Sequence, residues 1–161
     1  MKKRSKYRPK GVNPEAWKVA MLGSRVLSTD DALKRAEALR LSVEDACRGQ
    51  ATLAGWRLIF DCVNLAEQLC RQRVAQGLDA IEELQDTIAQ IHDRQKETGT
   101  KALYPAEMSA LRDFSADYAG ILSGVTNREY MEAQRGVEDR VRRILSTERI
   151  PESVRVLEAA E

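Results

Sequence analysis

The sequence predicts an all-α protein, an antiparallel bundle of five to six helices with a mobile basic N-terminal arm. Apolar residues recur at intervals of three and four along most of the chain, which is the spacing of one helix face. No segment alternates polar and apolar residues between turns, as a half-buried strand does. We therefore expect two parts, a flexible arm over residues 1–13 and a single helical domain over residues 14–161.

Length and composition favour one soluble globular core. The chain has 161 residues, of which 43% are hydrophobic, and this is sufficient for a self-supporting core. The longest stretch without a charged residue is Tyr118 to Asn127, ten residues, whereas a membrane-spanning helix needs about 17 to 25 apolar ones. The basic start is not followed by an apolar run, so we expect no secretory signal and a location in the cytoplasm.

The first helices are expected at residues 14–22 and 30–48. Asn13 suits the N-cap of the first, Pro14 suits its first turn, and Trp17 would anchor this short helix on the core. The run Ser28-Thr29-Asp30-Asp31 offers caps and two carboxylates for the start of the second.

The middle helices are expected at residues 53–75 and 78–98. Thr52 is a candidate cap for the first of them, and its broad apolar face, which includes Trp56, is typical of a central helix. The other has a narrow seam, which favours an antiparallel partner along its length. The seam consists of Ile81, Leu84, Ile88 and Ile91.

The last helices are expected at residues 105–125 and 127–146. Gly120 and Gly124 are spaced four apart near the end of the first, which favours fraying there, with close helix contact as the alternative. Thr126 and Glu129 fit a capping box for the second. Across all helices, the residues expected to be buried are Trp56, Ile59, Val63, Leu111, Leu122 and Val137.

The cysteines and the single histidine do not predict a metal or a cofactor. Cys47, Cys62 and Cys70 are an odd set on helical patterns, and we expect small core thiols. Cys62 and Cys70 would lie about 12 Å apart along one helix, too far for a disulfide. His92 is expected to be solvated or at an interface. A thiol nucleophile with His92 as its base remains a weaker alternative.

The carboxylates fall mainly opposite the apolar stripes, as solvated surface residues do. Asp61 comes nearest to an apolar stripe, and we expect it to point outward, with an inward position as the alternative. The other acidic residues considered for general acid or base chemistry are Glu82, Glu83, Asp86, Asp113, Asp117, Glu138 and Asp139.

Two basic features remain. Arg140, Arg142 and Arg143 lie near the end of the last helix, where they complement its negative dipole. The arm carries six cations and no acid, while residues 11–161 carry 20 bases and 25 acids, a net charge of −5. The cations of the arm favour binding to the phosphates of a nucleic acid or to a protein partner. The alternative is that the arm is only a solubilising tail. The candidate partner-binding or nucleic-acid-binding residues are Lys2, Lys3, Arg4, Lys6, Tyr7, Arg8 and Lys10.

The arm also carries a resemblance. Its Lys-Arg-Ser-Lys-Tyr-Arg-Pro-Lys-Gly-Val run over residues 3–12 resembles the opening of a group of short uncharacterised proteins encoded in proteobacterial prophages and mobile elements. The resemblance continues through residues 46–52 and 64–67. It implies an all-helical body and a phage-type accessory protein in the cytoplasm of a bacterial host cell, and it transfers no catalytic residue.

Taken together, these observations predict a non-enzymatic accessory protein that binds a host or phage protein and modulates or inhibits it. An anti-defence inhibitor of the anti-CRISPR kind is one form of this hypothesis. The main alternative is a nucleic-acid-binding accessory or regulatory protein that uses the basic arm. An enzyme with an unfamiliar site is a third hypothesis. We expect no membrane partner, and self-association into a homo-oligomer is compatible with the helical faces.

Overall fold

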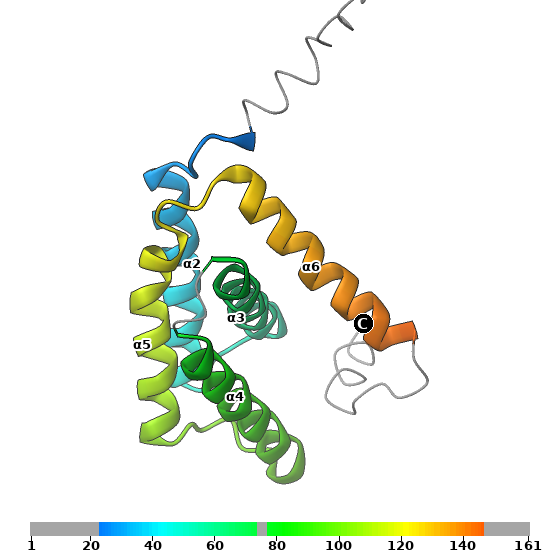
Figure 1. Cartoon of the computed structure of the whole chain (residues 1–161). Coiled ribbons are helices and arrows are strands. Elements are labelled where there is room, and N and C mark those ends of the chain that lie inside the picture. Colours follow the sequence, from blue (N-terminus) through cyan, green and yellow to red (C-terminus); the bar gives the residue numbers. More distant parts are fainter. Residues whose placement is uncertain (1–22, 74–76, 147–161) are drawn as a thin grey trace, which may run out of the picture.

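The computed structural model describes residues 23–73 and 77–146, and these ranges are all-helical apart from turns and one isolated β-bridge between Val26 and Thr126. The expected all-α class is therefore confirmed for them. The expected arm over 1–13, the helix over 14–22 and residues 147–161 lie outside the described residues. The helices are α2 (Thr29–Cys47), α3 (Leu53–Arg73), α4 (Leu78–Thr98), α5 (Pro105–Leu122) and α6 (Asn127–Ser146) (Figure 1).

Three helices begin at the caps that the sequence indicates. Ser28 Oγ accepts the Asp31 backbone N–H at 3.0 Å at the start of α2. Thr52 Oγ1 accepts a backbone N–H of the first turn of α3 at 3.1 Å. Before α6, the Glu129 carboxylate accepts the Thr126 N–H at 2.7 Å, and Thr126 Oγ1 accepts the Glu129 N–H at 3.2 Å. These bonds satisfy backbone donors that a helix start leaves free.

Helix α5 ends at Leu122, three residues before the expected end at residue 125. Gly124 adopts a φ of +71°, a left-handed conformation that favours glycine, and the chain turns there toward α6. Gly120 is exposed, and a Cβ built on it meets nothing within 4 Å. The two glycines therefore mark the end of a helix, and Gly120 is not a point of close helix contact.

Helices α2 and α5 lie side by side and run in opposite directions (Figure 1). The Leu27 N–H, just before α2, donates to the Val125 carbonyl after α5 at 2.7 Å. Near the other end of α2, Glu44 forms an ion pair of 2.9 Å with Arg112 in the middle of α5. The two helices are thus held together both at the turn after α5 and along their length.

Helix α3 is central, because it packs against α2, α4, α5 and α6. Helix α6 packs on α3 and stands away from α5, as Figure 1 shows. A further link comes from α2, where Arg35 Nη1 donates to the Tyr130 hydroxyl of α6 at 2.7 Å. Helix α6 is therefore attached to the rest of the bundle mainly through its contacts with α3.

The core confirms four of the six residues expected to be buried. Ile59, Val63, Leu111 and Leu122 are at most 1% exposed. The other two expectations are wrong, since Trp56 and Val137 are only partly buried. Trp56 lies near the start of α3 at the edge of the core, where it lines a surface hollow. Val137 lies on α6 beside a second hollow, where the sparse packing of α6 leaves its side chain partly open.

The loop between α4 and α5 is held by one buried carboxylate. Glu107 is 8% exposed, accepts two hydrogen bonds from the Arg94 guanidinium of α4, and also accepts the Tyr104 backbone N–H at 2.7 Å. The Arg94 guanidinium lies over the Tyr104 ring, 4.0 Å from its centroid. The hydrogen bonds from Arg94 hold the pKa of Glu107 below its ordinary value. Lys101 of this loop also lines an apolar hollow on the surface of the bundle.

Candidate functional site

An apolar hollow of about 240 Å³ opens between the end of α2, the start of α3, the second half of α4 and the loop before α5. We call it the Trp56 hollow. Helix α3 presents Leu53, Trp56 and Phe60 to it, at the i, i+3, i+7 spacing of one helix face. Its lining includes Leu53, Trp56, Phe60, Ile88, His92 and Lys101.

The hollow leaves apolar surface open to solvent. Leu53 is 39% exposed, and Trp56 and Phe60 are partly buried against the core. Covering this surface releases water from it, which favours the entry of an apolar group. Tryptophan is among the residue types that carry most binding energy at protein interfaces. The hollow is therefore suited to hold an apolar side chain of a partner.

His92 borders the hollow on α4, four residues after Ile88. Its ring is partly buried, and its Nδ1 atom is buried without a hydrogen-bond partner among the described residues. Asp93 Oδ1 lies 3.8 Å from this nitrogen. From the sequence, the His92 side chain was expected either in solvent or at an interface. The structure places its ring at the wall of the Trp56 hollow. Lys101, from the loop after α4, adds a positive charge to the lining of the hollow.

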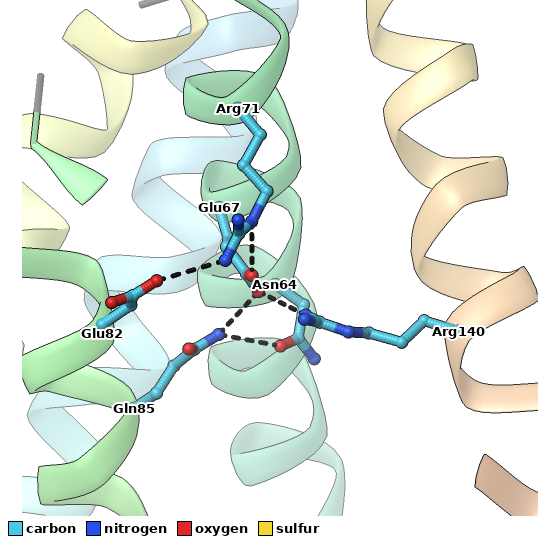
Figure 2. A network of polar contacts seen from close by, with 6 residues as sticks. All are labelled: Asn64, Glu67, Arg71, Glu82, Gln85 and Arg140. Carbon is cyan, nitrogen blue, oxygen red and sulfur yellow. Dashed lines mark hydrogen bonds and ion pairs between the residues drawn. The ribbon is translucent and has the colours of Figure 1, made fainter. Parts of the chain in front are cut away.

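A second feature joins three helices through one buried carboxylate, Glu67 of α3, which is 1% exposed. Figure 2 shows Arg140 reaching it from α6 and Gln85 from α4. Arg140 donates to Glu67 Oε2 at 2.5 Å, Gln85 donates to the same oxygen at 3.0 Å, and Arg71 donates to Oε1 at 2.9 Å. Arg71 also pairs with Glu82 of α4 at 3.1 Å. This network fixes α4 and α6 to the central helix.

The acidity of Glu67 reflects its partners. Burial raises the pKa of this carboxyl, but the hydrogen bonds from Arg140, Gln85 and Arg71 outweigh it and lower the pKa to about 2. Glu129 of α6 behaves alike, because hydrogen bonds from Arg73 and Thr126 lower its pKa to about 2. Both carboxylates are therefore ionised at neutral pH and hold arginines across the contact between α3 and α6.

The network corrects the interpretation of the basic end of α6. The helix dipole does not fully explain Arg140, whose guanidinium spans to α3 and holds Glu67. Arg142 lies 3.8 Å from Asp139, and Arg143 donates to the Asp139 carbonyl at 3.2 Å, both within α6. Sequence reasoning did not single out Glu67 as a site residue. Its position inside the broad apolar face of α3 is the signal that would have found it.

The cysteines are less uniformly buried than expected. Cys62 is 6% exposed, while Cys47 and Cys70 are only partly buried, and all three are free thiols. Burial raises the pKa of each thiol, which makes it a poorer nucleophile at neutral pH. Hydrogen bonding to Tyr118 partly offsets this rise in the pKa of Cys62, and burial also raises the pKa of Tyr118.

Asp61 points outward, as expected, and lines the hollow between α2, α3, α5 and α6. Partial burial raises the pKa of its carboxyl, and Arg57 opposes this rise. The other acidic residues weighed for acid or base chemistry are all exposed, so their interpretation as surface residues is confirmed. They are Glu82, Glu83, Asp86, Asp113, Asp117, Glu138 and Asp139.

Within residues 23–73 and 77–146, no three His, Cys, Asp or Glu side chains gather as a metal-binding group. No helix in these ranges is long and apolar enough to cross a membrane. The candidate arm residues, Lys2 to Lys10, lie outside these ranges. No family model, curated protein or solved structure matches the chain.

Proposed function

We propose that this protein is a non-enzymatic accessory protein of a phage or mobile element that binds a host or phage protein and modulates or inhibits it. The observation that carries this proposal is the Trp56 hollow, a concave apolar surface with a partly exposed tryptophan at its wall. An anti-defence inhibitor of the anti-CRISPR kind is the specific form suggested by the resemblance of residues 3–12 to mobile-element proteins.

The walls of the hollow support recognition of a protein side chain. Leu53, Trp56 and Phe60 come from a helix whose start is capped, and the opposite wall comes from α4. A preorganised apolar surface loses little conformational entropy when a partner covers it. His92 and Lys101 add polar groups beside this surface, where a partner's backbone or carboxylate would meet them.

The chemistry of the described residues supports binding rather than catalysis. The three thiols have raised pKa values, so none resembles an activated thiolate. The strongly perturbed carboxylates, Glu67 and Glu129, have lowered pKa values and hold arginines, which makes them structural anions rather than general acids.

A photo-crosslinking experiment tests the proposal. A benzoylphenylalanine replaces Lys101 at the wall of the hollow in the full chain, which is then expressed in the native host and illuminated. We expect position 101 to capture one protein reproducibly, identified by mass spectrometry. The captured protein, once purified, should then bind the chain without the crosslinker.

The matched control places the same probe at Leu41, an exposed leucine of α2 that does not line the Trp56 hollow. Equal capture at positions 41 and 101, or no capture at 101 above the background of 41, would contradict the proposal.

The alternative function, nucleic-acid binding by the arm, is supported by the six cations of residues 2–10. The dependence of binding affinity on salt concentration distinguishes the two functions. Neutralising about six phosphates makes the affinity fall steeply and linearly with salt on logarithmic axes. A protein complex held by the apolar hollow should lose little affinity between about 0.1 and 0.5 M salt. Tight DNA or RNA binding with the steep slope, lost on removing residues 1–12, would favour the alternative.

A further inference from the structure

A groove of about 510 Å³ lies between α4 and α5, apart from the Trp56 hollow. Its apolar floor includes Ile81, Leu84, Phe114 and Ile121. Three carboxylates line it, Glu83 from α4 and Asp113 and Asp117 from α5, and no basic residue is among the described residues of its lining. We call it the acidic groove.

The three carboxylates are not neutralised by the rest of the bundle. Asp113 accepts a hydrogen bond of 3.3 Å from Ser109, and among residues 23–73 and 77–146 no arginine or lysine forms an ion pair with Glu83, Asp113 or Asp117. Elsewhere on the same helices acids are paired, as Glu82 is with Arg71 and Glu107 with Arg94. The groove therefore presents uncompensated negative charge beside an apolar floor.

We propose that the acidic groove is the docking site for the basic segment Lys2–Lys10 of the same chain. This segment carries six cations and no acid, which complements the three carboxylates of the groove. Tyr7 and Pro9 are interleaved with the cations. An aromatic ring and a proline fit the apolar floor beside Phe114, while the flanking amines and guanidinium groups meet the acidic rim.

The path of the chain permits this contact. The chain enters the described part at Gly23, and Leu27 is bonded to Val125, close to the end of α5 where Ile121 begins the groove. The thirteen residue steps between Lys10 and Gly23 span up to about 43 Å when extended, and about 28 Å with the helix that the sequence predicts over residues 14–22. From Ile121 to Ala110 the groove follows α5 over about 17 Å. The segment can therefore lie along the whole groove without leaving its own molecule.

Docking in this way has a consequence for partners. The cations that would steer the protein toward phosphates or acidic proteins are covered while they occupy the groove. A partner that binds the segment must first displace it, so the groove acts as an internal competitor for residues 2–10. This role is independent of the Trp56 hollow, which lies at the other end of α4 and is lined by different residues.

Zero-length carbodiimide crosslinking of the full chain tests the proposal, because it joins lysine amines only to carboxylates that they touch. We expect amide links from Lys2, Lys3, Lys6 or Lys10 to Glu83, Asp113 or Asp117 in the monomeric product, mapped by mass spectrometry. About 1 M salt should remove them. In the double variant Asp113→Asn/Asp117→Asn, the remaining link to Glu83 should fall at least about threefold.

The matched control is Glu138→Gln/Asp139→Asn, which removes two exposed charges from α6 and should leave the links to the groove unchanged. Three results would overturn the proposal. One is links spread evenly over the exposed acids of the bundle. Another is the same yield at Glu83 in both double variants. The third is links found only in a covalent dimer, which would place the segment on a second copy.

Discussion

Glu67 of α3 and Arg140 of α6 form an ion pair of 2.5 Å, although 73 positions separate them in the sequence. The carboxylate is 1% exposed and the arginine side chain 45%, so the pair joins a buried anion to a cation at the surface. Because α6 packs on α3 and little else, this pair is a principal link between α6 and the bundle.

The first prediction concerns the contribution of Glu67 to stability. Glu67→Ala leaves the hydrogen bonds from Arg140, Gln85 and Arg71 without an acceptor, so we predict that the free energy of unfolding falls by about 2 to 3 kcal/mol. Glu82→Ala, which removes an exposed partner of the same Arg71, should cost less than about 0.5 kcal/mol. Urea unfolding measures both. Equal losses would show that the buried position of Glu67 is irrelevant.

The second prediction is the pH dependence of that contribution. Glu67 has a pKa of about 2 in the folded chain, below its ordinary 4.5, so its ionised form stabilises the fold. This stabilisation is fully present above pH 4.5 and is lost as the pH falls toward 2. The difference in free energy of unfolding between wild type and Glu67→Gln should therefore shrink on acidification.

Urea unfolding at several values between about pH 5.5 and 2.5 checks this dependence. Glu129 also has a pKa of about 2, so the Glu67→Gln variant should still lose some stability as the pH falls. A difference between wild type and variant that stays constant over this range would contradict the assignment.

The third prediction uses the two glycines at the end of α5. Gly124 has a φ of +71°, so Gly124→Ala should destabilise the fold by about 1 kcal/mol or more. Gly120 is helical and exposed, with nothing within 4 Å of an added Cβ. Gly120→Ala should therefore stabilise by about 0.5 to 1 kcal/mol. Thermal unfolding of both variants gives the signs, and a shift in the same direction would refute this description of the turn.

The fourth prediction separates the core from the hollow. Ile59 is 0% exposed, and Ile59→Ala should cost about 2 to 5 kcal/mol. Trp56 is only partly buried, so Trp56→Ala should cost less than Ile59→Ala despite removing a larger side chain. Chemical unfolding compares the two. A larger loss for Trp56 would place its ring in the core, as the sequence alone suggested.

Local signals predicted the helices well. Ser28, Thr52, Thr126 and Glu129 are capping residues whose effect depends on a few neighbouring positions, and the helices they begin start at or within one residue of the expected points. The end of α5 was harder, because the apolar stripe continues to Val125. That residue is fully buried although it lies beyond the helix, in the turn where its carbonyl bonds Leu27.

The candidate sites were harder to predict, because they depend on which helix faces meet. Periodicity placed Trp56 on an apolar face, but beside its ring lies an open hollow, lined in part by Lys101 of the loop before α5, and not a filled core. The partner of Glu67 lies on a helix far along the sequence, so no spacing rule connects it with Arg140. The acidic groove likewise needs α4 and α5 placed side by side before its carboxylates form one surface.

The affinity of the purified partner, once captured, tests the central claim most directly. Leu53→Asp places a charge in the Trp56 hollow at a side chain that is 39% exposed, and Leu41→Asp makes the same change on α2 at one that is 52% exposed. We predict that Leu53→Asp raises Kd about tenfold or more, while Leu41→Asp changes it by less than about twofold. Circular dichroism confirms that both variants fold. Equal affinities of the two variants for the partner would contradict binding through the hollow.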